Sequence, residues 1–174
     1  MNELSPGEWA VLGAVAEGPK HGFAVAQLLA ADGELGQVWT MPRPVVYQVI
    51  KKLAELGYVT ERKTEPGTRG PVRTIVGVTP AGRRALRKWL AEPVDHIRDV
   101  RSLLLLKLAL LYRSGADPSA LVTAQTERVK TQLQGLTRNR RSAAGFERAL
   151  LEWRIASSRA TVDFLSSASQ HLTS

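Results

Sequence analysis

Two runs of β-branched residues, joined by a loop rich in glycine and proline, constrain the fold more than any other part of this sequence. The runs are YVTERKT (58–64) and VRTIVGVT (72–79), and the loop between them is EPGTRGP (65–71). Such a pair predicts a β-hairpin. Helical patterns flank it on both sides, so we expect the hairpin to pack against helices.

The first helix is predicted from its capping residues. Ser5 is a favourable N-cap, Pro6 suits the first helical position, and Glu8 completes a capping box. A second helix is predicted over about 20–31, with Phe23 expected in the core.

The segment 37–41 is apolar and β-prone, which predicts a short strand. A third helix begins near Pro42 and ends before Gly57, and Thr79 opens another helix after the hairpin. The predicted order is therefore helix, helix, strand, helix, hairpin, helix, which is that of a winged helix. We expect a mainly α fold with a small β-hairpin, in which a winged helix-turn-helix domain (1–92) precedes a C-terminal helical domain (93–174).

The C-terminal domain is expected to hold three helices, over about 98–114, from 117 onwards, and over about 143–171. The last one carries apolar or small residues at alternating spacings of four and three, from Phe146 to Phe164, a pattern typical of a helix–helix seam. A second apolar stripe lies beside it, so we expect this helix to pack against a second copy of the chain. The residues predicted for dimerisation are Leu103, Leu106, Leu110, Val129, Leu133, Leu136, Phe146, Leu150, Trp153 and Phe164.

Charge is distributed unevenly along the chain. The net charge is +8, but residues 1–40 carry −4, residues 41–92 carry +7 and residues 93–174 carry +5. A sharp change to positive charge indicates a surface that binds a polyanion. Solvated arginines on an ordinary protein surface are the alternative.

The helix after Pro42 is the predicted recognition helix, because it is the second helix of a helix–turn–helix. Val46, Val49, Ile50 and Leu53 cluster on one side of it, and polar residues lie opposite. Arg43, Gln48 and Lys51 are expected to reach base edges in the major groove, with Pro44 at the leading end. Backbone phosphates are assigned to Tyr47, Lys52, Lys63, Arg69 and Arg73, the last three on the hairpin. Tyr47 has an alternative role, capping the edge of the core.

Other classes of function find little support. The chain has no cysteine, its three histidines are far apart, and no phosphate-binding loop or nucleophile motif occurs. We therefore predict no catalytic residue, no metal site and no cofactor. The N-terminus lacks the features of a signal peptide and no apolar run approaches membrane-spanning length, so a cytoplasmic location is expected. A winged helix that binds a protein partner instead of DNA is the alternative function.

Three segments resemble the PadR family of transcriptional regulators. They are LSPGEWAVLGAVAEGPKHGFAVAQLL (4–29), VVYQVIKKLAELGYVTE (45–61) and EPGTRGPVRTIVGVTPAGRRALRKWL (65–90). The resemblance covers about residues 4–90 in order, and the helical second part is similar to that of longer family members. Phe23 stands where the family usually has tyrosine.

The resemblance implies a homodimeric DNA-binding regulator, acting as a repressor on a pseudo-palindromic operator. The C-terminal helices of such a protein mediate dimerisation. It also implies release by a small lipophilic or aromatic effector.

Overall fold

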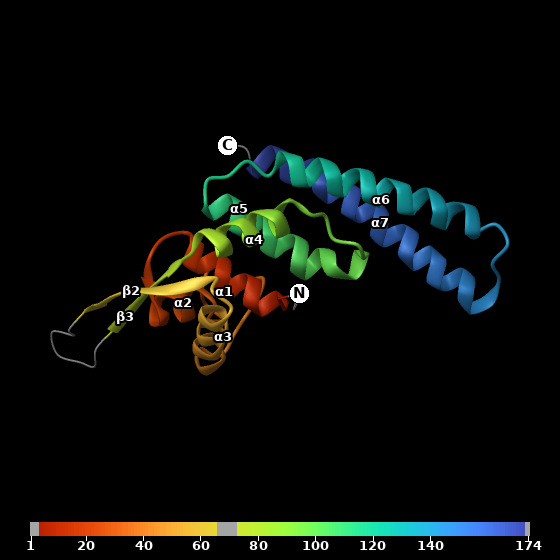
Figure 1. The fold of residues 1–174 in the computed structure, drawn as a ribbon. Helices are drawn as coiled ribbons and strands as arrows, with labels where there is room; N and C mark the ends of the chain where they lie inside the picture. Colours follow the sequence, from red (N-terminus) through yellow and green to blue (C-terminus); the bar gives the residue numbers. More distant parts are fainter. Residues whose placement is uncertain (1–3, 66–72, 173–174) are drawn as a thin grey trace. The chain divides into compact units, whose positions relative to one another are not determined.

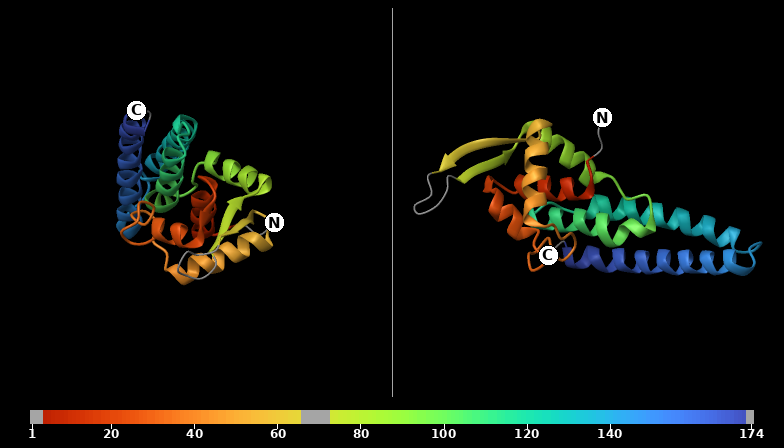
Figure 2. Two further views of the ribbon diagram at one scale, coloured as in Figure 1. Left: turned by 90° about the vertical axis from the view of Figure 1, so that its left-hand side faces the viewer. Right: turned by 90° about the horizontal axis from the view of Figure 1, so that it is seen from below.

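The chain forms two compact units in a computed structural model that describes residues 4–65 and 73–172. Unit 1 is Met1–Trp89 and unit 2 is Leu90–Ser174. Figures 1 and 2 show the helices and strands of each unit.

Helix α1 (Pro6–Ala16) begins as its capping residues predict. The Ser5 amide donates to the Glu8 carboxylate over 2.9 Å, and the Ser5 hydroxyl accepts from the Glu8 amide over 3.4 Å, so the capping box is confirmed. Most of this helix is buried. It is therefore the central element of unit 1, around which the other helices and the sheet pack.

The second predicted helix is shorter than expected, because its first two residues belong to the sheet. Lys20–His21 form strand β1, and α2 covers only Gly22–Leu28. The strand predicted over 37–41 is wrong. Its backbone bonds locally instead, with the Trp39 amide donating to the Leu35 carbonyl over 2.8 Å. Gly36 permits this compact turn, since a Cβ there would lie 1.6 Å from the Ala30 carbonyl oxygen.

The predicted hairpin is confirmed and gains a third strand. Strands β2 (Val59–Glu65) and β3 (Arg73–Val78) are antiparallel, and β1 pairs with the other edge of β3, giving the order β1-β3-β2. The register pairs Val59 with Val78 and Lys20 with Val76. The expected fold class, a mainly helical winged helix with a small antiparallel sheet, is confirmed.

Helices α3 (Arg43–Glu55) and α4 (Pro80–Ala91) complete unit 1. Pro42 is the N-cap of α3, and Gly57 follows the helix with a φ of +72°, a left-handed conformation that favours glycine. The Thr79 hydroxyl accepts from the Gly82 amide over 3.0 Å and so caps α4. Pro42 and Thr79 thus precede the first residues of the two helices, and Gly57 follows the end of α3.

Unit 2 begins with an irregular helical segment. The single helix predicted over 98–114 is instead a 3₁₀ turn (Ile97–Asp99), a π-helical turn (Val100–Leu104) and α5 (Leu105–Arg113). Two long helices follow, α6 (Ser119–Asn139) and α7 (Gly145–Leu172), which lie side by side (Figure 1). No helix in the described ranges is long and apolar enough to cross a membrane.

A cluster of aliphatic side chains forms the core of unit 2. One buried polar residue crosses it: the Gln125 amide group accepts from the Val94 amide over 2.7 Å and donates to the Val94 carbonyl over 3.1 Å. Both hydrogen-bonding groups of the buried backbone at Val94 are thereby satisfied. The cluster consists of Val94, Leu104, Leu108, Leu121, Val122 and Leu165.

Lys107 is a charged residue in an unusual position, because only 3% of its surface is exposed. Its ammonium group donates to the Glu92 backbone carbonyl over 2.5 Å. Burial lowers the pKa of Lys107 to about 8, although the negative charge of Glu92 acts in the opposite direction. The lysine thus ties α5 to the segment after α4 at a cost in desolvation.

This burial predicts a pH-dependent stability. An unfolded lysine has a pKa of about 10.4. Between that value and the folded pKa of about 8 the unfolded chain binds more protons, so stability rises with pH. We expect the free energy of unfolding to be about 2 kcal/mol higher at pH 10 than at pH 8, measured by urea unfolding and circular dichroism. Lys107→Met should abolish the rise, whereas Lys130→Met, at an exposed position, should keep it. An equal rise in both variants would contradict this assignment.

Candidate nucleic-acid interface

Helix α3 places its apolar and polar side chains on opposite sides, as the sequence predicts. Val46, Ile50 and Leu53 are buried, and Val49 is half-buried. On the opposite side the structure exposes the five residues expected to face the groove or the backbone near it: Arg43, Pro44, Tyr47, Gln48 and Lys51. The predicted recognition helix therefore presents one continuous solvent-facing side.

Arg43 stands over two aromatic rings at the beginning of this side. Its guanidinium carbon lies 4.8 Å from the centre of the Phe23 ring and 5.8 Å from that of Tyr47. Both distances are within the range of cation–π attraction. The rings are themselves exposed, Phe23 to 45% and Tyr47 to 41%. The expectation of Phe23 as a core residue is therefore wrong.

The position of the Tyr47 ring depends on Gly22. A Cβ at Gly22 would lie 2.7 Å from Cε1 of Tyr47, so the ring occupies space that any other residue would fill. Tyr47 thus packs against the start of α2 with part of its ring and remains exposed with the rest. This arrangement agrees with both roles considered for Tyr47.

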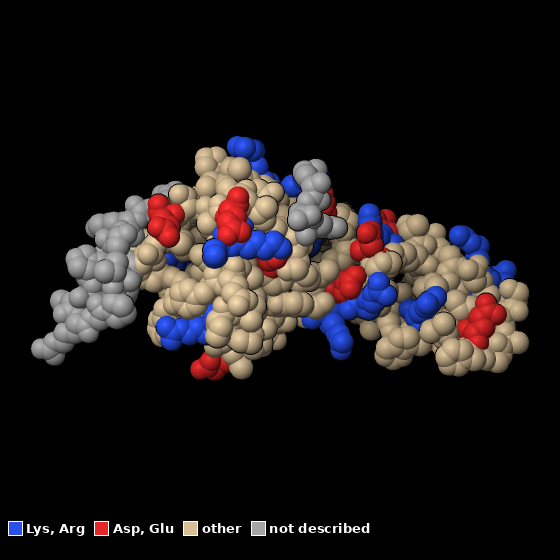
Figure 3. All heavy atoms as spheres, turned by 60° about the horizontal axis from the view of Figure 1, so that its bottom comes forward, with Lys and Arg blue, Asp and Glu red and all other residues tan. Residues whose placement is uncertain are grey.

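Gln48 and Lys51 follow Arg43 along the exposed side. Among the described residues neither Arg43 nor Lys51 forms an ion pair, so both positive charges are available to a ligand. Figure 3 brings the α3 side of unit 1 forward and shows basic side chains interspersed with acidic ones across a largely neutral surface. The positive charge on this side is therefore carried by a few separate side chains, with no dense patch among the residues that the structure describes.

Lys52 differs from Lys51, because it is already paired. Its ammonium group donates to the Glu8 carboxylate over 2.5 Å, and Glu8 is buried. Burial by itself raises the pKa of Glu8, but hydrogen bonds from Lys52 and from the Ser5 amide outweigh it, so the pKa lies below its ordinary value. The pair joins α3 to α1. Lys52 therefore has a structural contact that the sequence analysis did not anticipate.

The hairpin residues are described only in part. Lys63 lies on β2 beside an irregularity between Glu61 and Lys63, and Arg73 is the first residue of β3, where it pairs with Glu65. Arg69 lies outside the described residues.

The residues predicted for dimerisation fall into two groups. Leu106, Leu110 and Val129 are buried within the chain, so the expectation that they lie in an interface does not fit. The inner stripe of α7, which includes Leu151, Ile155 and Leu165, is also buried. The other predicted residues are exposed or half-buried: Leu103, Leu133, Leu136, Phe146, Leu150, Trp153 and Phe164.

The exposed group contains the largest apolar side chains on the surface of α7. Phe146 is 84% exposed and Trp153 is 71% exposed, and Leu150 and Phe164 extend the same seam. Large aromatic side chains left in water in this way mark a surface for association. We refer to Phe146, Leu150, Trp153 and Phe164 as the outer seam of α7.

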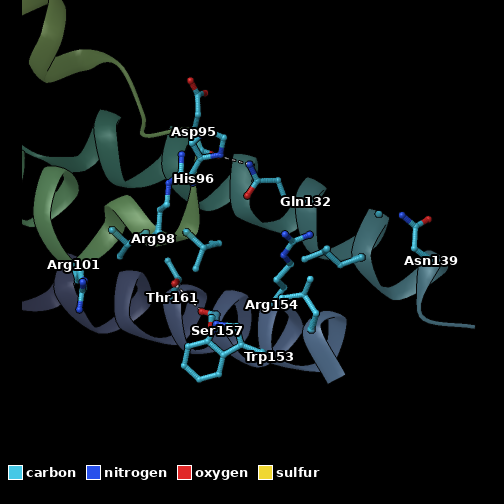
Figure 4. A pocket seen from close by; sticks show the side chains of 15 residues that line it. Asp95, His96, Arg98, Arg101, Gln132, Asn139, Trp153, Arg154, Ser157 and Thr161 are labelled. Atoms are coloured by element: carbon cyan, nitrogen blue, oxygen red, sulfur yellow. Dashed lines mark hydrogen bonds between the residues drawn. The ribbon is translucent and has the colours of Figure 1, made fainter. Parts of the chain in front are cut away.

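A pocket of about 920 Å³ lies within unit 2, between the segment 95–101, α6 and α7 (Figure 4). The Gln132 amide donates to the Asp95 carbonyl at its rim over 2.7 Å. Its walls combine apolar and cationic side chains, and Arg101 and Arg154 form no ion pair among the described residues. The lining includes Arg98, Arg101, Leu136, Leu150, Trp153 and Arg154.

Comparison with known proteins identifies similar sequences. Residues 11–88 match the profile of the family described as "Transcriptional regulator PadR-like family", which spans from within α1 to within α4. The negative transcriptional regulator PadR of Bacillus subtilis (strain 168) is 27% identical over 130 residues, covering 74% of this chain and 70% of that protein.

Solved structures of similar chains include two of Bacillus subtilis PadR. The complex with operator DNA has a TM-score of 0.48 and 23% identity, covering 95% of this chain and 98% of that chain. The complex with p-coumaric acid has a TM-score of 0.45 and 22% identity, covering 98% of this chain and 100% of that chain.

Proposed function

We propose that the chain is a PadR-like transcriptional regulator, which represses transcription as a homodimer bound to a pseudo-palindromic operator; the match of residues 11–88 to that family's profile supports the proposal. Members of this family regulate transcription and are not enzymes. The Bacillus subtilis relative is a negative regulator, which supports repression as the direction of control. Acting on genomic DNA, the protein would work in the cytoplasm.

The observation that carries the proposal is the exposed side of α3. An α-helix fits the major groove of B-DNA, where arginine and glutamine can form hydrogen bonds with base edges. Arg43 and Gln48 are exposed at the leading half of α3, and Lys51, without an ion pair among the described residues, follows them toward the phosphates. We assign base contacts to Arg43 and Gln48 and a mainly electrostatic contact to Lys51. Tyr47, Lys63, Arg69 and Arg73 are proposed as additional backbone contacts.

A homodimer accounts for the outer seam of α7. The exposed Phe146 and Trp153 would be covered by the same seam of a second copy, since a two-fold interface is self-complementary. Two recognition helices held about 34 Å apart then meet successive major grooves on one face of the DNA.

The pocket in unit 2 is proposed as the effector site. Its apolar lining suits an aromatic carboxylate, as do Arg101 and Arg154, which form no ion pair with any residue in 4–65 or 73–172. The pocket shares Leu136, Leu150 and Trp153 with the surface proposed for dimerisation. A bound effector would therefore change the packing of the two copies and, through it, the spacing of the recognition helices.

The neighbouring lysines of α3 give a matched test of operator binding. Lys51→Met should lower affinity for the DNA upstream of the protein's own gene several-fold and reduce the slope of log affinity against log salt by about one, with the melting temperature unchanged. Lys52→Met should instead destabilise the protein by about 1 kcal/mol, because it leaves the buried Glu8 carboxylate without its partner. Gel shifts over a salt series and thermal unfolding provide the measurements. Binding that is absent, or insensitive to salt, would favour a protein-interaction module instead.

Dimerisation can be tested at the centre of the outer seam. Light scattering of the wild type should give twice the chain mass of 19.0 kDa, about 38 kDa. Trp153→Arg should give a monomer at the same concentration, because a charge replaces an exposed apolar ring in the seam. Arg159→Met, a change at an exposed position outside the seam, is the control. A wild-type monomer would refute the dimer.

The effector site can be tested by isothermal titration with benzoate and cinnamate. Aromatic carboxylates should bind and release the operator, while their neutral amides should bind more weakly. Arg154→Met should weaken carboxylate binding about tenfold, whereas Arg141→Met, outside the pocket lining, should not. Equal binding to wild type and Arg154→Met would exclude this pocket.

A further inference from the structure

We propose that Phe23 is a positioning residue for operator reading, which holds the Arg43 guanidinium in place to bond a guanine in the major groove. This inference rests on the proposed function, because it needs a DNA operator. It assigns a role to an α2 residue that is otherwise only an exposed aromatic side chain on the surface of unit 1.

The surroundings of Arg43 restrict its guanidinium group. The residue is exposed and forms no ion pair among the described residues. Its guanidinium carbon lies 4.8 Å from the centre of the Phe23 ring and 5.8 Å from that of the Tyr47 ring. An unrestrained arginine side chain occupies many rotamers, whereas a guanidinium attracted to two ring faces occupies fewer. The rings thus restrict where the group points before any ligand arrives.

The exposure of the apolar Phe23 ring to solvent is unfavourable unless the ring has a partner. Phe23 has no polar atom on its side chain, yet 45% of its surface meets solvent beside the start of the recognition helix. The core of unit 1 does not require a ring there, since Val25 and Ala26 are the side chains by which α2 is buried. The contact with the Arg43 guanidinium explains why an aromatic ring is exposed at this position.

The second ring, that of Tyr47, has a fixed position. Gly22 leaves the space that Tyr47 occupies, and a Cβ at Gly22 would meet Cε1 of that ring at 2.7 Å. The Tyr47 ring of α3 therefore packs against Gly22 of α2, the residue before Phe23. Two rings on adjoining helices, α2 and α3, then hold one guanidinium between the helices.

The chemistry of the guanidinium indicates what it reads. The group is planar, and stacking on a ring occupies a face while leaving its N–H groups free at the edge. Two parallel N–H groups match O6 and N7 of guanine, the commonest specific contact of arginine in the major groove. A phosphate contact is the other use of such a group, but it carries no sequence preference.

The test is a selection of bound sequences from a randomised DNA duplex, followed by affinity measurements on the selected operator and its single-base variants. Wild type should prefer guanine at one position in each half-site, and 7-deazaguanine there should weaken binding because N7 is missing. Arg43→Lys should reduce that preference about tenfold. Phe23→Leu should reduce the same preference several-fold without changing preferences elsewhere or the slope of affinity against salt.

Two further variants separate positioning from general damage. Phe23→Tyr keeps the ring and should keep the preference, while Leu56→Ala, an exposed apolar residue at the other end of α3, should leave it unchanged. The double variant Phe23→Leu with Arg43→Lys should lose no more than Arg43→Lys alone, because the two act as a unit.

The outcomes distinguish the two proposals. If the wild type enriches no sequence, operator binding itself fails and the inference fails with it. If the wild type selects an operator but Phe23→Leu retains the full guanine preference, only the role of Phe23 is refuted. A uniform loss of affinity with a shallower salt slope would make Arg43 a phosphate contact and would also overturn the inference.

Discussion

Glu8 uses one carboxylate oxygen to cap α1 at the Ser5 amide and the other to hold the ammonium group of Lys52 on α3. A buried carboxylate is costly unless it is bonded in this way, and its two contacts together compensate for that burial. The same side chain thus fixes the beginning of the central helix and the orientation of the recognition helix against it. The exposed positions of Arg43, Gln48 and Lys51 follow from that orientation.

Much of unit 1 could be predicted because its signals are local. Capping at Ser5 and Thr79, the glycine after α3 and the two strands of the hairpin each depend on a few neighbouring residues, and each is confirmed. The three motif segments predicted a resemblance to the PadR family, and the profile match over residues 11–88 agrees with it. Strand β1 was missed because two residues carry no periodicity, and only their pairing with β3 makes them a strand.

What the sequence analysis missed in the candidate site depends mainly on contacts between residues distant in the sequence. The bond from Lys52 to Glu8 joins positions 44 residues apart, which no pattern within α3 reveals. Phe23 could have been placed correctly, since a helical wheel of α2 with Val25 and Ala26 inward turns it to the side. The burial of Leu106, Leu110 and Val129 could not have been predicted from the sequence, because the pattern of a strongly apolar helix does not indicate which of its side chains the same chain covers.

Gly22 makes no hydrogen bond with a base or a phosphate in the arrangement proposed here, yet the Tyr47 ring occupies the space of its missing side chain. An alanine at this position would displace the ring, and with it one of the two surfaces on which Arg43 rests. In a genetic screen for loss of repression, Gly22 would therefore be recovered alongside the residues that touch DNA. Such a screen would recover residues that shape the proposed DNA-binding surface as well as residues that contact DNA. The list of recovered positions would not by itself separate these two kinds of residue.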